Sequence, residues 1–156
     1  ITVAENELMN MFPTDLHGGI DKDHYISSLR IGGEACEQIE RIGRIIVSDI
    51  DSVFYQSAYD LGKNHMQSMK PLTKFDLSNE YSEVFKFPLP TGVGSYKELE
   101  VMETFDIGIH RLFIYNVLRE RTVKPISPLF HIHSYYAQWR KNNKLPTDYL
   151  FRNGNA

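Results

Sequence analysis

The chain has 156 residues, of which 42% are hydrophobic and 24% are charged, as expected for one globular domain with its own core. Its formal net charge of −3 gives no electrostatic reason to expect a nucleic acid or an anionic membrane as a partner. A single cysteine, Cys36, excludes an internal disulfide framework and a cysteine-based zinc site and fits the cytoplasm. No apolar run approaches the roughly 20 residues of a membrane-spanning helix. We therefore expect a soluble, cytoplasmic single domain over residues 1–156.

The first part of the chain mixes short strands with helical segments. Apolar spacing predicts strands over residues 1–4, 8–12, 24–31 and 45–50. The strand over residues 1–4 opens abruptly, as if incomplete, and the pair Gly18 and Gly19 predicts a loop. A helix is expected over residues 34–43, where Ala35, Cys36, Ile39 and Ile42 form an apolar stripe.

A second helix is predicted over residues 53–61, with Val53, Ala58 and Leu61 facing inward and Gly62 ending it. Residues 63–95 show no regular pattern. Longer strands are expected over residues 98–105, 109–120 and 129–140. Several strands, few short helices and long connections predict a mainly β, antiparallel barrel rather than a parallel α/β sheet.

A candidate anion site follows the strand over residues 24–31. Ser27 and Ser28 offer hydroxyl groups, and Arg30 offers a forked cation for phosphate. Gly32 and Gly33 would let the first turn of the next helix approach a ligand with free amide groups. The alternative is an ordinary glycine turn that caps the helix and leaves Arg30 in solvent.

The end of the strand over residues 8–12 is a second candidate site. Asn10, Pro13, Thr14 and Asp15 offer polar groups to the edge of a planar ring, and neighbouring methionine and phenylalanine side chains suit its faces. Taken alone, the segment is equally a turn at the end of a strand.

An ordered series of motifs resembles the flavin reductase-like family. It runs through Asn-Met-Phe-Pro-Thr-Asp-Leu, Ser-Leu-Arg, the helix Glu-Ala-Cys-Glu-Gln-Ile-Glu-Arg-Ile-Gly, Leu-Gly-Lys-Asn-His, Lys-Phe and Asp-Ile-Gly-Ile-His-Arg-Leu-Phe-Ile, and covers residues 1–136. The resemblance implies an antiparallel split β-barrel with two or three short helices. It also implies non-covalently bound FMN, a homodimer with the flavin near the interface, and in many members reduction of flavin by NADH or NADPH.

The resemblance also implies residue roles. Asn10, Pro13, Thr14 and Asp15 would lie along the isoalloxazine ring, and Ser27, Ser28, Arg30, Gly32 and Gly33 near the phosphate. Ser48 stands where relatives commonly have asparagine, and Asn64 and His65 belong to a loop that closes over the flavin. His110 matches a histidine associated with nicotinamide, although Ile109 replaces the acidic residue of that turn.

Three weaker signals have simpler explanations. His131 and His133 would share one face of a strand, but a structural role is favoured over a metal site. Cys36 suits burial as a small hydrophobe. Trp139 and its neighbouring tyrosines suit packing in the core or at an interface better than covering a flavin.

Three functions remain open at this point. The leading one is an FMN-binding flavin reductase that transfers hydride from NAD(P)H. The others are an FMN-binding electron carrier or sensor without reductase turnover, and a split-barrel structural protein that holds no flavin.

Overall fold

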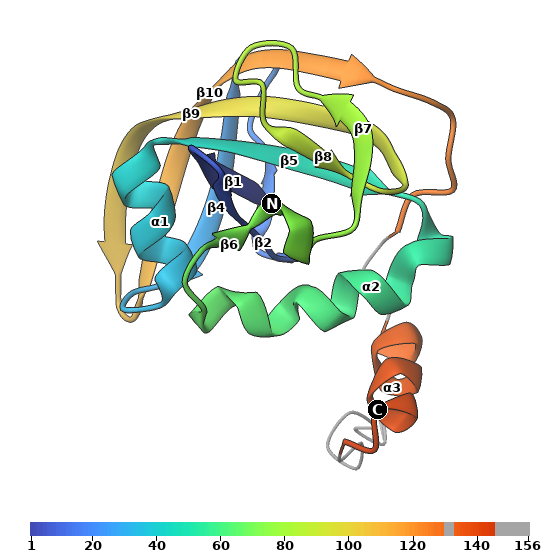
Figure 1. Cartoon of the computed structure of the whole chain (residues 1–156). Coiled ribbons are helices and arrows are strands. Elements are labelled where there is room, and N and C mark those ends of the chain that lie inside the picture. Colours follow the sequence, from blue (N-terminus) through green and yellow to red (C-terminus); the bar gives the residue numbers. More distant parts are fainter. Residues whose placement is uncertain (130–132, 146–156) are drawn as a thin grey trace.

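The computed structural model describes residues 1–129 and 133–145, and within them the fold is mainly antiparallel β (Figure 1). One sheet of eight strands has the order β3-β4-β10-β9-β5-β1-β2-β6, and β7 and β8 form a second sheet. The strands are β1 (Thr2–Glu5), β2 (Leu8–Met11), β3 (His17–Gly19), β4 (His24–Arg30), β5 (Arg44–Ile50), β6 (Lys70–Pro71), β7 (Leu77–Tyr81), β8 (Pro88–Pro90), β9 (Val93–Ile107) and β10 (His110–Thr122). The helices are α1 (Glu34–Ile42), α2 (Tyr55–Asp60) and α3 (His133–Asn142), with 3-10 turns η1 (Ser52–Phe54), η2 (Leu61–Met66) and η3 (Leu72–Lys74). The predicted mainly β, antiparallel fold with short helices is confirmed.

Helix α1 closes one side of the curved sheet (Figure 1). Its predicted apolar stripe is confirmed, because Ala35, Cys36 and Ile39 are buried among core residues of β1, β5, β9 and β10. Gly43 ends the helix with a φ of 70°, a left-handed conformation that suits glycine. Burial raises the pKa of the Cys36 thiol, which fits the expected role as a small hydrophobe.

The β9–β10 pair is the longest in the sheet, and Gly108 turns it with a φ of 59°. On β10 the alternation is regular: Phe113 and Tyr115 lie in the core, whereas Leu112 and Ile114 on the opposite face are half-exposed. This strand therefore has the core on one side and an outer face on the other.

Two glycines, one just before β9 and one at its start, lie against large side chains. At Gly92, which has a φ of 83°, a Cβ atom would lie 2.3 Å from the Phe54 ring. At Gly94 it would lie 2.3 Å from Cγ1 of Ile126. Because no side chain fits at either position, both glycines are needed for close packing at this corner.

The predicted strand over residues 129–140 is wrong, because residues 133–142 form helix α3. Aromatic residues favour strands in general, but here they meet at helical spacing. Tyr136 stacks on Trp139 at 5.8 Å between ring centroids, and Nη1 of Arg140 donates to the Tyr136 hydroxyl at 3.1 Å. His133 opens this helix, so it shares no strand with His131, which lies outside the described residues.

Three further predictions are wrong. Gly18 and Gly19 belong to the edge strand β3, where they pair with β4 instead of forming a loop. Val53 is 72% exposed, because it lies in η1 and not on the inner face of a longer helix. The chain also passes Gly62 in a helical path, since η2 continues to Met66. A 3-10 turn has a tighter period than an α-helix, so it changes which residues face inward.

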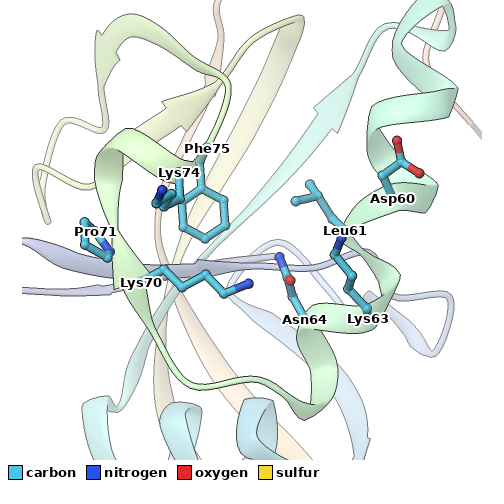
Figure 2. Close-up of a pocket in the computed structure, with 8 residues that line it drawn as sticks. All are labelled: Asp60, Leu61, Lys63, Asn64, Lys70, Pro71, Lys74 and Phe75. Atoms are coloured by element: carbon cyan, nitrogen blue, oxygen red, sulfur yellow. The ribbon is translucent and has the colours of Figure 1, made fainter.

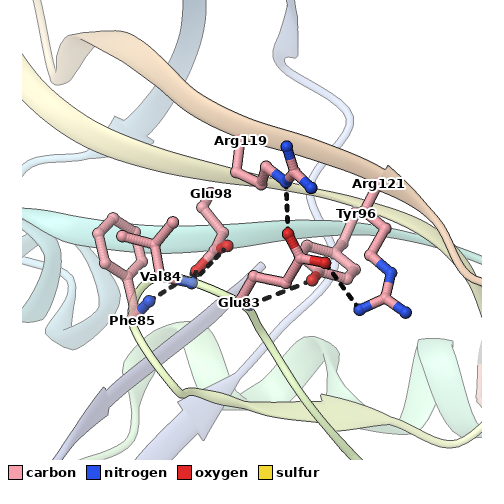
Figure 3. A network of polar contacts seen from close by, with 7 residues as sticks. All are labelled: Glu83, Val84, Phe85, Tyr96, Glu98, Arg119 and Arg121. Atoms are coloured by element: carbon pink, nitrogen blue, oxygen red, sulfur yellow. Dashed lines mark hydrogen bonds and ion pairs between the residues drawn. The ribbon is translucent and has the colours of Figure 1, made fainter.

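The loop between β7 and β8 is held to the main sheet by carboxylates (Figure 3). Glu98 on β9 is fully buried and accepts hydrogen bonds from the backbone N–H groups of Val84 and Phe85, at 2.9 and 2.7 Å. Glu83 pairs with Arg119 and Arg121 of β10. The hydrogen bond from Arg119 is the main reason why the pKa of Glu83 lies below its usual value.

Among the described residues, no helix combines the length and the apolar character needed to cross a lipid bilayer. The same residues contain no group of three or more histidine, cysteine, aspartate or glutamate side chains that could hold a metal ion.

Candidate functional site

A cavity of about 1020 Å³, here called the main cavity, lies where the ends of β2 and β5 meet the helical segment of α2 and η2. Its size is at the upper end of the range typical of ligand pockets. Four residues that the sequence nominates line it: Pro13, Thr14, Asp15 and Ser48. The structure therefore joins the segment after β2 with the end of β5, which are separate in the sequence.

Ser48 supplies an unsatisfied polar atom at the main cavity. Its Oγ is buried and has no hydrogen-bond partner among the described residues. Ser48 pairs with Tyr96 in the β5–β9 ladder, so the backbone at this position is fixed. Buried hydroxyl groups in proteins are nearly always satisfied. An orphaned hydroxyl on the lining of a cavity therefore indicates a ligand with a polar edge.

Aromatic side chains form another wall of the main cavity. Phe12, Phe54 and Phe75 line it, as do Tyr59 and Trp139. Nε1 of Trp139 donates to Oδ1 of Asp60 at 3.1 Å, which attaches α3 to the end of α2. Such rings offer flat apolar surfaces with polar edges, a combination that suits a planar heteroaromatic ligand.

His65 supports the segment after β2 instead of lining the main cavity. Its Nε2 lies 2.6 Å from the carbonyl oxygen of Pro13. Since a carbonyl can only accept, this nitrogen carries the proton. Its ring packs on Phe12 at 4.6 Å between centroids. Burial lowers the pKa of His65, so the imidazole is neutral at neutral pH.

Asn10 and Asn64 form a buried link behind the same segment. Nδ2 of Asn10, a residue only 1% exposed, donates to Oε1 of Gln38 at 2.8 Å and to the main-chain carbonyl of Asn64 at 2.9 Å. In return, Nδ2 of Asn64 donates to the carbonyl of Met11 at 2.9 Å. Asn10 thus holds β2, α1 and η2 together, and its amide group is engaged with the protein's own atoms.

A second cavity of about 470 Å³, here called the lysine cavity, adjoins the main one (Figure 2). Its lining residues are Asp60, Leu61, Lys63, Asn64, Lys70, Pro71, Lys74 and Phe75. Five of these, Asp60, Leu61, Lys63, Lys74 and Phe75, also line the main cavity. Oδ1 of Asn64 is buried and lacks a partner among the described residues.

The sequence did not nominate the three lysines as site residues. A usable signal was present, because residues 61–75 contain Lys63, Lys70 and Lys74 and no acidic residue. An uncompensated run of one charge is more often solvated than functional. Only the turn of the chain through η2, β6 and η3 brings these side chains to one cavity.

The predicted phosphate corner lies apart from both cavities. Ser27 is fully buried, and its hydroxyl lies 2.7 Å from that of Tyr115. Ser28 is half-buried on the other face of β4. Arg30 is exposed and pairs directly with His110 across the β4–β10 ladder. None of these four nominated residues lines the main cavity or the lysine cavity.

The first turn of α1 is covered by the end of η2. A Cβ atom at Gly33 would lie 3.2 Å from the carbonyl oxygen of Arg30 and 3.5 Å from that of His65. Gly32 is exposed, with a φ of 77°. Glu34 and Glu37 already place negative charge at this helix end, where the macrodipole is positive. The local geometry is that of a tight turn that packs α1 on η2.

Comparison with known proteins gives structural matches. No family model and no curated protein matches the sequence. The flavin reductase of styrene monooxygenase from Pseudomonas putida S12 is 21% identical, with a TM-score of 0.65 over 82% of this chain and 80% of that one. Flavoredoxin from Methanosarcina acetivorans is 15% identical, with a TM-score of 0.68 over 82% and 75%.

A third match is the FMN-binding protein from Thermus thermophilus with bound 1-cyclohex-2-enone. It is 18% identical, with a TM-score of 0.64 over 78% of this chain and 67% of that one. The chain therefore has the split-barrel fold of flavin reductases and FMN-binding proteins.

Proposed function

We propose that the chain binds FMN without a covalent bond and acts as a flavin reductase with NADH or NADPH as the donor. The observation that carries the proposal is the main cavity, which is lined both by aromatic side chains and by Ser48, whose buried hydroxyl is unsatisfied. Solved structures of this fold include flavin reductases and an FMN-binding protein. Bound FMN would supply the redox chemistry, accepting hydride from the nicotinamide ring.

In this proposal the protein's own residues bind and orient the ring system. Pro13, Thr14 and Asp15 lie along its polar edge, and Ser48 provides a hydroxyl contact. The aromatic residues contact its faces and exclude water. Hydride transfer requires no strong acid or base, so the chemistry needs no titrating residue in the cavity.

Arg30, Gly32, Gly33 and His110 do not line the main cavity, so we propose that they reach a bound nucleotide from a second copy of the chain. The exposed apolar side chains Phe105, Ile107 and Ile109 surround the β9–β10 turn next to His110. Such side chains suit a homodimer interface. The unpaired thiol of Cys36 fits a cytoplasmic location.

The test is direct flavin binding followed by turnover. Purified protein is titrated with FMN by absorbance and fluorescence, and oxidation of NADH and NADPH is then measured with and without added FMN. Saturable FMN binding and FMN-dependent oxidation are expected. Ser48→Phe would place a ring at the lining of the main cavity and should abolish both, whereas Ser78→Ala, in β7 and not part of the cavity lining, should retain both. Absence of FMN binding in the wild-type protein would reject the proposal.

A second candidate function is an FMN-binding electron carrier without reductase turnover. It is favoured by Ile109, which occupies the turn position where the resembling family has an acidic residue, and by the absence of His110 from the lining of the main cavity. This protein would bind FMN in the same titration but would not oxidise either nicotinamide nucleotide. The two readouts therefore separate the candidates.

A further inference from the structure

The lysine cavity concentrates positive charge on a chain that is negative overall. Lys63, Lys70 and Lys74 contribute three positive charges, and Asp60 is the acidic residue among the lining residues. Figure 2 shows Lys63 on the η2 side of the cavity and Lys74 on the opposite side. The formal charge around this space is thus +2, on a chain with a net charge of −3. Like charges held near one another favour the arrival of an anion.

The three ammonium groups lack anionic partners among the described residues. None of them takes part in an ion pair with a carboxylate there. Lys70 donates to the side-chain oxygen of Gln67, which is neutral. The Asp60 carboxylate accepts from Trp139. Elsewhere the same chain pairs its cations readily, as Arg111 does with Asp106 and Glu40. The positive charge of the three lysines at this cavity is therefore not balanced by ion pairs among the described residues.

The buried side chain of Asn64 indicates, independently of the lysines, that a ligand in this cavity must donate a hydrogen bond. It is buried to 2% exposure, and its amide nitrogen is fixed on the Met11 carbonyl. The other atom, Oδ1, has no partner among the described residues. A carbonyl oxygen accepts hydrogen bonds, so a phosphate oxygen cannot satisfy it but a hydroxyl group can. The ligand that fits this cavity carries an anionic group together with hydroxyl groups.

A phosphorylated polyol or sugar has this chemistry. The rest of such a ligand can extend into the adjoining main cavity. Lys63, Lys74 and Phe75 belong to both cavities, so one ligand can place its ring in the main cavity and its charged tail in the lysine cavity. Lysine binds phosphate as a point charge on a flexible stem, without the fixed geometry that arginine imposes.

We propose that Lys63, Lys70 and Lys74 form the phosphate subsite for a nucleotide bound in the main cavity, with Asn64 accepting from a hydroxyl of its sugar or ribityl chain. This inference rests on the proposed function and places the phosphate on the η2 side of the cavity. The phosphate belongs either to the flavin or to the nicotinamide nucleotide. The first carries a phosphorylated ribityl chain and the second a phosphorylated ribose, so both combine phosphate with hydroxyl groups.

The test compares ligands with and without phosphate. The variant Lys63→Gln/Lys70→Gln/Lys74→Gln is matched by Lys22→Gln/Lys86→Gln/Lys124→Gln, which removes the same charge from positions that line neither cavity. If the flavin supplies the phosphate, the first variant should bind FMN about 10- to 100-fold more weakly, as expected for the loss of charge-assisted bonds. Its affinity for riboflavin, which has no phosphate, should stay within about twofold. The control variant should bind both ligands normally.

If the nicotinamide nucleotide supplies the phosphate, FMN affinity stays unchanged and the KM for NADH or NADPH rises about tenfold or more. Inorganic pyrophosphate should then inhibit the wild-type protein and not the first variant. The proposal is overturned if neither FMN affinity nor KM changes while riboflavin still binds.

A wild-type protein that binds neither FMN nor riboflavin would reject the proposed function. In that case, pyrophosphate binding measured by calorimetry tests whether the three lysines form an anion site. Binding that the first variant loses supports an anion site. No binding to the wild-type protein rejects it.

Discussion

The side-chain amide of Asn10 donates a hydrogen bond to the main-chain carbonyl of Asn64, 2.9 Å away, and so joins β2 to η2. The two residues are far apart in the sequence, and Asn64 returns a hydrogen bond to β2 through Met11. This reciprocal link fixes the wall that the main cavity and the lysine cavity share. It lies beneath the candidate site and gives that site a rigid base.

Replacing Asn10 with alanine should destabilise the chain and loosen η2. The change leaves Oε1 of Gln38 buried without its donor and removes one of two hydrogen bonds to the Asn64 carbonyl, which keeps the N–H of Gln67; a buried unsatisfied group costs about 1–3 kcal/mol. We expect the free energy of unfolding, measured with urea, to fall by about 2–4 kcal/mol, since more than one acceptor is affected. The exposed Asn79→Ala should change it by less than about 0.5 kcal/mol. Equal effects of the two variants would contradict the role of Asn10.

Ser48→Ala should separate ligand binding from stability. Because its hydroxyl has no partner among the described residues, removal should leave the stability of the ligand-free protein unchanged or slightly increased. FMN binding should weaken about 3- to 10-fold, the equivalent of one neutral hydrogen bond. Titration with FMN and urea unfolding are measured on the same preparations.

Ser82→Ala is the matched comparison for Ser48→Ala. Ser82 is also buried, but its hydroxyl accepts from the backbone N–H of Phe87 at 3.0 Å. Its loss should cost about 1–3 kcal/mol of stability without affecting FMN affinity. A large loss of stability in Ser48→Ala would instead show that its hydroxyl is satisfied within the protein.

Glu98→Gln should release the loop between β7 and β8. Oε1 accepts from both Val84 and Phe85, so the amide nitrogen would replace Oε2 and turn an N–H group toward the backbone N–H of Val84, where only an acceptor fits. We expect a loss of about 2–3 kcal/mol in unfolding free energy, together with faster hydrogen exchange at Val84 and Phe85. Glu100→Gln, on the same strand in an exposed pair with Arg44, should cost less than about 1 kcal/mol. Protection of the loop amides that survives Glu98→Gln would refute the proposed anchor.

The stability of the protein should fall as the pH drops below the ordinary histidine pKa. Burial lowers the pKa of His65 from 6.5, so at pH values between the two pKa values the unfolded chain holds more protons than the folded one. Unfolding is favoured there by added protons, and stability rises with pH until the ordinary pKa is passed. The pKa of His17 is lowered for the same main reason and adds to the slope.

His65→Gln should reduce this dependence, because glutamine can still donate to the Pro13 carbonyl but does not titrate. Urea unfolding between about pH 5 and pH 8 measures the slope in both proteins. An NMR titration of the His65 ring gives the folded pKa directly. A slope that is identical in wild-type and His65→Gln protein would disprove the assignment.

Most of the fold follows from local patterns in the sequence. The strand predicted over residues 129–140 is wrong because contacts between distant segments decide the structure there. The stripe of α1 and the alternation of β10 are set by residues within each element, so their periods are readable. The aromatic residues of 135–139 satisfy both a strand and a helix pattern, and the choice depends on contact with Tyr55 and Tyr59 of α2. Contacts of that kind become visible only in the folded chain.

The sequence likewise predicts some residues of the candidate site and not others. Pro13, Thr14, Asp15 and Ser48 line the main cavity, and each was nominated from sequence motifs. The lysines were not, because Lys63, Lys70 and Lys74 come from three different short elements around Pro71. Conversely, the pair Gly32 and Gly33 before a helix predicts a tight turn with free amide groups. This local pattern does not indicate whether the turn lies at a cavity.

The two glycines at the start of β9 restrict how this sequence can change over time. Phe54, whose ring lies over Gly92, is also part of the main cavity lining. Any larger residue at position 92 would clash with the Phe54 ring and would also have to adopt the left-handed backbone conformation found there. A substitution at this corner of the barrel is therefore coupled to the shape of the binding site, because relieving the clash means moving a side chain that lines the main cavity.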